Sequence, residues 1–528
     1  MRNVLKNNIG AAAALGLFGM SMCVAQTAVA PATMQKIGSV DERFQSYNME
    51  MLEVTGGRFW APYKDHKEAA PAPAPKPGAP VGMDPSLYAY RPPLDLSNAK
   101  RRKLAAALGP AYIRVSGTWA NSTFFQDDDK PAMKTPPEGF GGVLTRAQWK
   151  GVIDFGKAAN AEIVTSMAIS PGVRGTDGVW TPVEAKKFLA YTKQAGGKIA
   201  VAEMFNEPTF AVMGGAPRMY DAETYGKDYK VFQAYMRKEA PGTLLIGPGS
   251  VGETATLSGG SPIPGIKLLP TEAMLTASGP GLDGFSYHFY GGVSQRCKMM
   301  GAAAQATPEA ALSSKWLNST VEDEEFYAKL RDRFEPGKPM WLTETGETAC
   351  GGNPWASDFV DSFRYLNQLG ALAKRSVKSI MHNTLDASDY SLLDETTLTP
   401  KPNYYAAVLW RRLMGTTVLE AGASPSEDLH LYAQCLRGKP GGVALLAINA
   451  DKSAAHELSV PVASERYTLT AKELLSPTVD LNGTELKLSA DDSLPKMAGV
   501  STKAGTVSFA PESITFLAMP KVGNASCK

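Results

Sequence analysis

The sequence predicts an α/β fold, a (β/α)8 TIM barrel followed by a C-terminal antiparallel β-sandwich. Between residues 44 and 415, short apolar runs alternate with longer amphipathic stretches, which is the order of βαβ units. Beyond Gly415 the long helical patterns stop and short alternating runs take over. The apolar runs of the first part number eight, the strand count of a closed barrel, at residues 44–51, 112–115, 162–166, 199–205, 244–247, 284–287, 340–343 and 379–383.

The other predicted elements follow from their periodicity. Amphipathic stretches predict helices at residues 99–108, 145–160, 182–195, 221–239, 322–334 and 355–374. Alternating apolar residues between turn residues predict sandwich strands at 429–435, 443–448, 457–460, 467–471 and 514–518. The stretch 69–93 is rich in Pro and Ala, which predicts a semi-rigid, polyproline-like chain outside the core. This stretch follows the first predicted strand. It would therefore either close one side of the barrel face at which the strands end, or form a surface insert.

These patterns divide the chain into four parts. We expect a signal peptide at 1–30, an N-terminal segment at 31–43 that could add a strand to the sandwich, the barrel at 44–415 and the sandwich at 416–528. Arg2, Lys6, a short apolar run and Ala28-Val29-Ala30 are typical of a cleavable secretory signal. The apolar run is shorter than the roughly 20 residues of a membrane span. We therefore expect a secreted or periplasmic protein without a membrane span.

The formal charges nearly cancel, since Lys and Arg number 54 and Asp and Glu number 52. This balance argues against a protein that coats nucleic acid or an acidic membrane. Beyond the signal segment, four cysteines would enter an oxidising compartment, which favours disulfides and allows three pairings. Their wide spacing argues against a zinc site, so we expect no metal and no cofactor.

Two glutamates follow predicted strands and are the candidate catalytic residues. The run 199–205 leads into Asn206-Glu207-Pro208, and the run 340–343 leads into Glu344-Thr345. Since the carboxyl ends of barrel strands share one face, both carboxylates would reach the same mouth. Two facing carboxylates suit glycosidic bond cleavage, in which one protonates the leaving oxygen and the other attacks the sugar or activates water. A solvated or salt-bridged glutamate is the alternative at either position.

With these motifs the chain resembles glycoside hydrolase family 79, the heparanase and β-glucuronidase group. The resemblance rests on Asn206-Glu207-Pro208 and on the run from Trp341 through Glu344 to Gly352. Further similar segments occur in the family's order, at residues 112–118, 144–149, 288–290 and 390–394. The resemblance covers the chain from about Phe44 to its C terminus. It implies a retaining double displacement, with Glu207 as acid/base and Glu344 as nucleophile.

The resemblance also implies roles for other residues at the strand ends. Asn206 would hold the sugar 2-hydroxyl, and Tyr290 would hydrogen-bond the nucleophile. Arg114 would either keep Glu344 ionised or form a structural ion pair within the barrel. His288 would polarise a group of the site or serve as a hydrogen-bonded structural residue. Glu50, which ends the first predicted strand, and Thr118, within a family-like segment, are further candidate substrate contacts.

Selectivity for a uronic acid would come from a glycine pair and a tyrosine. Gly351 and Gly352 would offer backbone N–H groups to the sugar carboxylate, and Tyr390 its hydroxyl. A simple turn before a helix is the alternative for the glycines. Between Glu344 and this pair the chain is one residue longer than the heparanases, and Cys350 stands where they carry a tyrosine. The resemblance further implies a disulfide between Cys435 and Cys527, which leaves Cys297 to pair with Cys350.

The leading hypothesis is a retaining, exo-acting β-glucuronidase whose substrate is a glucuronide or a glycan that contains glucuronic acid. Heparanases grip sulfated chains with basic clusters, whereas this chain is electrically balanced, which favours exo action or an unsulfated substrate. The alternatives are an endo-acting, heparanase-like glycosaminoglycan hydrolase and a barrel hydrolase of neutral β-glycosides. A catalytically silent carbohydrate-binding protein is the alternative from another class.

Overall fold

The computed structural model describes residues 27–63, 85–254, 268–300 and 304–528. Most of the predicted signal peptide, residues 1–26, and residues 69–84 of the Pro-rich insert lie outside the described residues. The last residues of the predicted signal lie against the sandwich, where the Val29 N–H donates to the Ser459 carbonyl at 3.0 Å. None of the helices that the structure describes has the length and apolar character needed to cross a bilayer.

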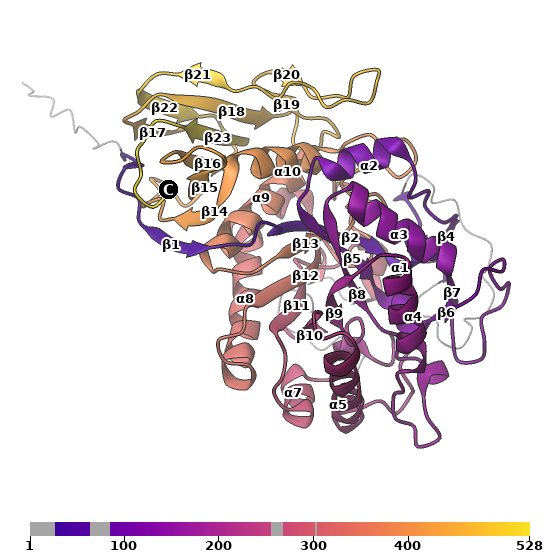
Figure 1. Ribbon diagram of the computed structural model, residues 1–528. Helices are drawn as coiled ribbons and strands as arrows, with labels where there is room; N and C mark the ends of the chain where they lie inside the picture. Colours follow the sequence, from indigo (N-terminus) through magenta and orange to yellow (C-terminus); the bar gives the residue numbers. More distant parts are fainter. Residues whose placement is uncertain (1–26, 64–84, 255–267, 301–303) are drawn as a thin grey trace, which may run out of the picture.

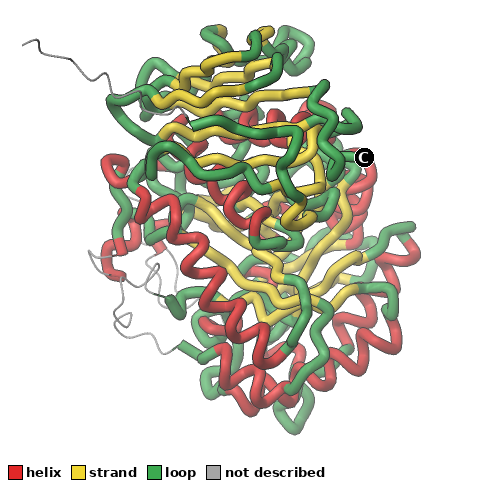
Figure 2. Tube along the Cα trace, turned by 90° about the vertical axis from the view of Figure 1, so that its left-hand side faces the viewer, coloured by secondary structure: helices red, strands yellow, loops and turns green. Residues whose placement is uncertain are grey.

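Eight parallel strands close into a barrel, and helices surround it (Figures 1 and 2). The strands are β2 (Gln45–Glu50), β5 (Ala111–Ser116), β8 (Ala161–Ser166), β9 (Ile199–Glu203), β10 (Leu244–Ser250), β11 (Gly284–Tyr290), β12 (Met340–Gly346) and β13 (Ile380–His382). The helices are α1 (Met51–Thr55), α2 (Ala99–Ala106), α3 (Arg146–Ala158), α4 (Val183–Gln194), α5 (Ala222–Glu239), α7 (Thr271–Ser278), α8 (Ser314–Phe334), α9 (Phe359–Lys374) and α10 (Pro402–Leu413). The predicted fold class is confirmed.

The helices begin where polar side chains cap them. Thr145 and Gln148 form a capping box at the start of α3, in which each side chain bonds the other residue's backbone N–H. Asn98, Asp221 and Ser313 cap α2, α5 and α8 in the same position with one side-chain oxygen each. Helix α8 begins earlier than the predicted residue 322, because the cap at Ser313 adds turns that the apolar periodicity does not mark.

The sandwich packs on one side of the barrel, next to α9 and α10 (Figure 1). Its larger sheet contains β1 (Lys36–Ser39), β14 (Met414–Leu419), β15 (Leu429–Leu436), β16 (Val443–Asn449), β18 (Ser464–Thr470), β19 (Asp480–Leu481), β20 (Thr484–Glu485), β21 (Val500–Thr502) and β23 (Ser513–Met519). The smaller sheet pairs β17 (His456–Val460) with β22 (Gly505–Phe509). The N-terminal strand β1 pairs with β14.

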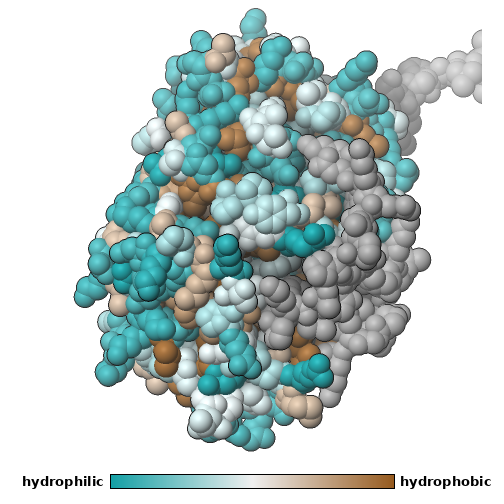
Figure 3. Space-filling view, turned by 90° about the vertical axis from the view of Figure 1, so that its right-hand side faces the viewer, coloured by the Kyte–Doolittle hydropathy of each residue, from teal (hydrophilic) through white to brown (hydrophobic). Residues whose placement is uncertain are grey.

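A glycine and a tyrosine join the two parts of the molecule. Gly370 lies on α9, and a Cβ there would come within 2.3 Å of the Tyr432 ring on β15. The missing side chain lets the ring pack against the helix, and the Tyr432 hydroxyl donates to Asn367 Oδ1 at 2.7 Å. The face of the molecule in Figure 3 is mainly hydrophilic, with scattered apolar residues.

Part of the predicted Pro-rich insert is a strand, which corrects the expectation of a polyproline-like chain across 69–93. Strand β4 (Tyr88–Arg91) pairs antiparallel with β3 (Gly57–Trp60), which follows α1. The composition of the whole stretch obscured these four residues, which contain no proline and alternate aromatic and other side chains. A second short pair, β6 (Thr123–Gln126) and β7 (Gly142–Thr145), follows β5.

Candidate active site

The two predicted carboxylates meet at the carboxyl ends of the barrel strands. Glu344 lies inside β12, which extends to Gly346, beyond the predicted end at residue 343. Glu207 lies beyond β9, which ends at Glu203 rather than at the predicted Phe205. One oxygen of each carboxylate and Nδ1 of His288 all lie within 4.8 Å of one another. This separation allows both carboxylates to contact one small group.

Glu207 occupies a strained turn. Its backbone is left-handed, with φ 49° and ψ 63°, a conformation that non-glycine residues seldom adopt. Asn121 holds the preceding residue, because its Oδ1 accepts the Asn206 N–H at 2.8 Å and its Nδ2 donates to the Asn206 carbonyl at 2.9 Å. Pro208 then begins the short 3-10 turn η5 (Pro208–Phe210). The turn therefore fixes the direction of the Glu207 side chain toward the mouth.

Arg114, on β5, connects the groups of the site. Its side chain is 1% exposed, and its Nη1 donates to Glu344 Oε2 at 2.8 Å. Its Nε donates to Glu203 Oε2 at 2.9 Å, and its Nη2 donates to Asn206 Oδ1 at 2.7 Å. The bond to Oδ1 orients the Asn206 amide so that its NH2 group points away from the guanidinium. One rigid cation thus fixes the position of a predicted nucleophile and of a predicted sugar ligand.

Glu203 is a buried site residue that the sequence did not single out. It accepts hydrogen bonds from Ser286 at 2.9 Å and from Thr343 at 2.8 Å in addition to that from Arg114. Burial is the largest single effect and opposes its ionisation, but the charge of Arg114 together with the hydrogen bonds from Thr343 and Arg114 holds the pKa of Glu203 below its ordinary value. The sequence feature that could have identified Glu203 is a carboxylate within the apolar run 199–205.

His288, on β11, lies between Arg114 and Glu207. Its Nε2 is 3.3 Å from Arg114 Nη2, and its Nδ1 is 3.0 Å from Glu207 Oε1. A guanidinium can only donate, so Nε2 accepts and the ring proton is on Nδ1, from where it is donated to Glu207. Burial lowers the pKa of His288 to about 4, which keeps the ring neutral near pH 7. The histidine thus orients Glu207 and does not add a charge.

The carboxyl group of Glu207 has a raised pKa. Burial raises the pKa of Glu207 to about 7, and the charge of Arg114 opposes that rise. The bond from His288 occupies Oε1, which leaves Oε2 to carry a proton toward the mouth. Glu207 can therefore act as an acid and then as a base near neutral pH.

A tyrosine–asparagine network supports Glu344 on its other side. The Tyr290 hydroxyl donates to Glu344 Oε1 at 2.7 Å. Asn383, directly after β13, places its Nδ2 3.1 Å from the Tyr290 hydroxyl, 3.0 Å from the Tyr390 hydroxyl and 3.3 Å from Glu50 Oε1. Burial and the charge of Glu344 raise the pKa of Glu50 well above its ordinary range. Asn383 ends the eighth predicted strand, the same signal that singled out the two glutamates.

The predicted uronate loop lies beside this network. Gly351 and Gly352 have φ angles of 81° and 82°, and Cys350 before them has φ 65°. A Cβ at Gly352 would come within 3.1 Å of the Tyr390 ring, so only glycine fits without displacing that ring. Cys350 is bonded to Cys297, which lies in the turn after β11. Both expected disulfides are present, and the second joins Cys435 to Cys527 across 92 residues of the sandwich.

Glu347 accepts hydrogen bonds from residues at both ends of the uronate loop. It accepts the Asn353 N–H and the Asn353 Nδ2, both at 3.0 Å, and the Thr348 hydroxyl at 2.7 Å. Burial raises the pKa of Glu347 to about 7. These bonds occupy both carboxylate oxygens of Glu347. Thr118 begins the 3-10 turn η3 (Thr118–Ser122) directly after Gly117 and is half-buried.

Within the described residues, Glu207, His288 and Glu344 form one group that could hold a metal ion. The proton on Nδ1 of His288 points at Glu207, and the guanidinium of Arg114 contacts Glu344. A cation at this point would lie next to Arg114 and would displace both donors. These contacts do not favour a metal ion at this point.

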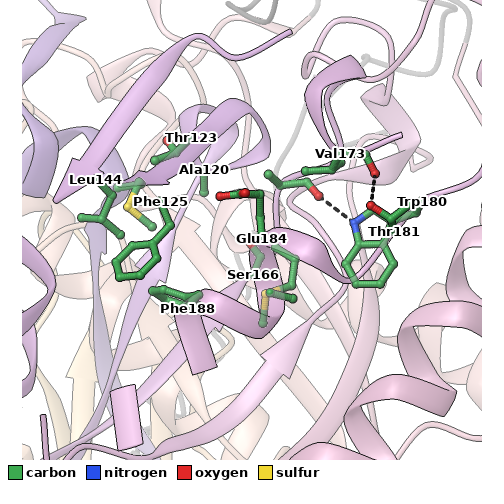
Figure 4. A pocket seen from close by; sticks show the side chains of 14 residues that line it. Ala120, Thr123, Phe125, Leu144, Ser166, Val173, Trp180, Thr181, Glu184 and Phe188 are labelled. Atoms are coloured by element: carbon green, nitrogen blue, oxygen red, sulfur yellow. Dashed lines mark hydrogen bonds between the residues drawn. The ribbon is translucent and has the colours of Figure 1, made fainter. Parts of the chain in front are cut away.

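A separate cavity lies behind the loops that follow β5 and β8 (Figure 4). Apolar side chains such as Phe125, Trp180 and Phe188 line most of it. Glu184 also lines it, and its Oε1 accepts from Lys187 Nζ at 2.6 Å. None of the predicted site residues lines this cavity, so it is distinct from the site.

Comparisons with known proteins agree with this arrangement, although no family model matches the chain. Heparanase-like protein 1 of Arabidopsis thaliana is 25% identical over 496 residues, which cover 82% of this chain and 86% of that protein. The hyaluronoglucuronidase of Hirudo nipponia is 25% identical over 508 residues, 85% of this chain and 95% of that protein. The chain is thus similar to heparanase-like and glucuronidase proteins over most of its length.

Solved structures share the fold at low sequence identity. The 4-O-α-L-rhamnosyl-β-D-glucuronidase of Fusarium oxysporum 12S superposes with a TM-score of 0.60 at 11% identity. The match covers 94% of this chain and 99% of that chain. It shows that the barrel and the sandwich occur together in other proteins.

Replacing the central arginine tests whether the site depends on it. Arg114→Met leaves Glu203 buried without its cation, and we expect a loss of about 3–5 kcal/mol in the free energy of unfolding at pH 7. Because the folded-state pKa of Glu203 is lowered, the ionic stabilisation is present above the unfolded pKa and is lost on acidification. The difference from wild type should therefore shrink below about pH 4.5.

Urea unfolding at pH 7 and at pH 4 measures both effects. Arg237→Met is the matched control, since Arg237 is 40% exposed in its pair with Asp283 and should contribute about 1 kcal/mol or less. Equal losses for the two variants would contradict the central role of Arg114.

Proposed function

We propose that the protein is a retaining glycoside hydrolase of family 79 that removes β-linked glucuronic acid from the end of its substrate. The observation that carries the proposal is the short separation of the two carboxylates, with one oxygen of Glu207 and one of Glu344 within 4.8 Å. Retaining glycosidases hold their carboxyl groups about 5–5.5 Å apart, whereas inverting enzymes need room for a water between them. Similarity to heparanase-like proteins supports the same chemistry.

In the first step Glu344 attacks the anomeric carbon of the glucuronate. Its lone pair forms a C–O bond as the glycosidic C–O bond breaks, and the proton of Glu207 passes to the leaving oxygen. Arg114 and Tyr290 each donate a hydrogen bond to one Glu344 oxygen, which fixes the orientation of the carboxylate. Neutral His288 donates to Glu207 and stabilises the carboxylate that remains after proton transfer.

In the second step water releases the sugar. Glu207 takes a proton from the water, whose oxygen attacks the anomeric carbon, and the bond to Glu344 breaks. The free glucuronate leaves with its original β configuration, and Glu207 is again protonated. A group with a pKa of about 7 can perform both transfers near neutral pH.

Selectivity for the uronate follows from the loop after β12. The backbone N–H groups of Gly351 and Gly352 and the Tyr390 hydroxyl would bind the sugar carboxylate, and the absence of glycine side chains allows a close approach. Asn206 would bind the 2-hydroxyl with the NH2 group that Arg114 leaves free, and Glu50 and Thr118 would contact the rest of the ring. Two disulfides favour an exported protein, in keeping with the signal-like N terminus.

Hydrolysis of 4-nitrophenyl β-glucuronide and of the matching β-glucoside tests the proposal. We expect the wild type to prefer the glucuronide in kcat/KM, and Glu344→Ala to lose at least about 10⁴-fold because it lacks the nucleophile. Tyr390→Phe should narrow the preference for the glucuronide about tenfold without changing glucoside turnover.

Turnover of the glucoside alone would discard Gly351, Gly352 and Tyr390 as uronate ligands and favour a hydrolase of neutral β-glycosides. Turnover of neither substrate, with cleavage of longer chains, would favour an endo-acting enzyme. Binding without turnover would favour a carbohydrate-binding protein.

The pH dependence tests the role of Glu207. The acid must be protonated in the free enzyme, so kcat/KM for phenyl β-glucuronide should fall as the pH rises above about 7. Phenol is a poor leaving group and needs a proton from the acid as it departs. The rate on this substrate therefore depends on whether Glu207 is protonated. Glu207→Ala should be slow and should lose this alkaline limb. A wild-type profile that stays flat to pH 9 would contradict the assignment.

A further inference from the structure

Three aromatic side chains contact one another on the segments that follow β2 and β5. Trp60 lies on β3, Tyr88 on β4 and Trp119 in the turn after β5. The Trp60 and Tyr88 ring centroids are 4.7 Å apart, and those of Tyr88 and Trp119 are 6.0 Å apart. All three are half-buried. We call these residues the aromatic wall.

The closed barrel sets the position of the aromatic wall relative to the carboxylates. Around the barrel β13 lies opposite β9, the strand that leads to Glu207, and β2 follows β13. The β3–β4 hairpin follows β2 through α1, and Trp119 follows β5, which is the next strand. Trp60 and Tyr88 therefore follow β2, which adjoins the strand opposite β9, whereas Trp119 follows β5, which is separated from β9 by β8.

The wall is continuous with the uronate loop. A Cβ built on Gly351 would come within 2.7 Å of Trp60 Cγ, so the indole packs directly on this glycine. Trp60 and Tyr88 also pack against the apolar cluster that contains Tyr290 and Tyr390. No side chain separates the indole from the loop that would bind the sugar carboxylate.

Polar contacts join the hairpin and the residues after it to the segments that follow β13 and β11. Arg91 donates from Nη2 to the Trp60 carbonyl at 2.6 Å and forms an ion pair with Glu395, which lies after β13. Arg296, after β11, donates from Nη1 to the Ala61 carbonyl at 2.9 Å. The Tyr63 hydroxyl is 2.5 Å from Ser294 Oγ, also after β11. The hairpin and the residues after it thus extend from the end of β2 to the loop after β11, and Trp60 of the hairpin packs on Gly351 of the uronate loop.

The geometry of a glucuronate places its 4-hydroxyl at this wall. C4 is across the ring from C1, so its hydroxyl points away from Glu207, and C4 is bonded to C5, which carries the carboxylate. With the carboxylate on Gly351, Gly352 and Tyr390, the 4-hydroxyl faces the adjoining Trp60. Resting on the proposed function, we infer that the aromatic wall admits a terminal glucuronate with a free 4-hydroxyl and excludes one that carries a sugar there. Trp60 is the specificity-determining residue.

Two matched substrates test the inference: 4-nitrophenyl β-glucuronide and the same glucuronide with a sugar linked to its O4. We expect the wild type to cleave the substituted compound at least about 100-fold more slowly in kcat/KM. Trp60→Ala should reduce this ratio about tenfold or more by relieving the clash. Tyr88→Ala, which removes the stacking partner of Trp60, should reduce it in the same direction. Tyr90→Ala is the control, since Tyr90 is on the same hairpin but 68% exposed, and should leave the ratio unchanged.

The outcomes separate this inference from the proposed function. Cleavage of both compounds by the wild type within about threefold would overturn the inference and the proposed exo action, and would leave the proposed glucuronide hydrolysis by Glu207 and Glu344 intact. Equal losses on both substrates in Trp60→Ala and Tyr88→Ala, with the ratio unchanged, would also overturn it. If the wild type cleaves neither compound, the proposed function itself fails, and the inference fails with it.

Discussion

The site depends on one buried cation, the guanidinium of Arg114. It is almost fully buried and donates to Glu203, Glu344 and Asn206 from three different nitrogens. A cation without partners at this depth would be strongly destabilising, and so would either carboxylate without the cation. Because each of these buried charges must keep its partner, the strands that carry them, β5, β9 and β12, are fixed relative to one another. The short distance between the two candidate catalytic carboxylates follows from that arrangement.

The same cation places the two nearby carboxyl groups of Glu207 and Glu344 in different surroundings. Arg114 contacts Glu344 directly, while Glu207 receives a bond from neutral His288 and is affected mainly by burial. Burial without a direct cation raises the pKa of Glu207 to about 7, so this group can hold a proton near neutral pH. Different surroundings thus give two chemically identical side chains the separate roles that the proposed double displacement needs.

Much of the fold and part of the site could be predicted from the sequence. Period-2 and helical patterns identified the eight barrel strands, and a carboxylate after an apolar run identified Glu207 and Glu344. Glu203 was missed because it lies inside an apolar run, where only the three-dimensional approach of Arg114 explains a charge. The β3–β4 hairpin was missed because local strand propensity at 88–91 is obscured by the proline-rich composition around it. The αL turn at Glu207 depends on tertiary contacts from Asn121 and carries no local sequence signal.

The central claim is that Glu344 forms a covalent bond to the sugar. Incubation with 2-deoxy-2-fluoro-β-D-glucuronosyl fluoride, which slows release of the intermediate, followed by peptide mass spectrometry tests it most directly. We expect one fluoroglucuronosyl group on the peptide that contains Glu344, and none in Glu344→Ala. A label on Glu207, or no label together with an inverted product from a cleaved glucuronide, would contradict it.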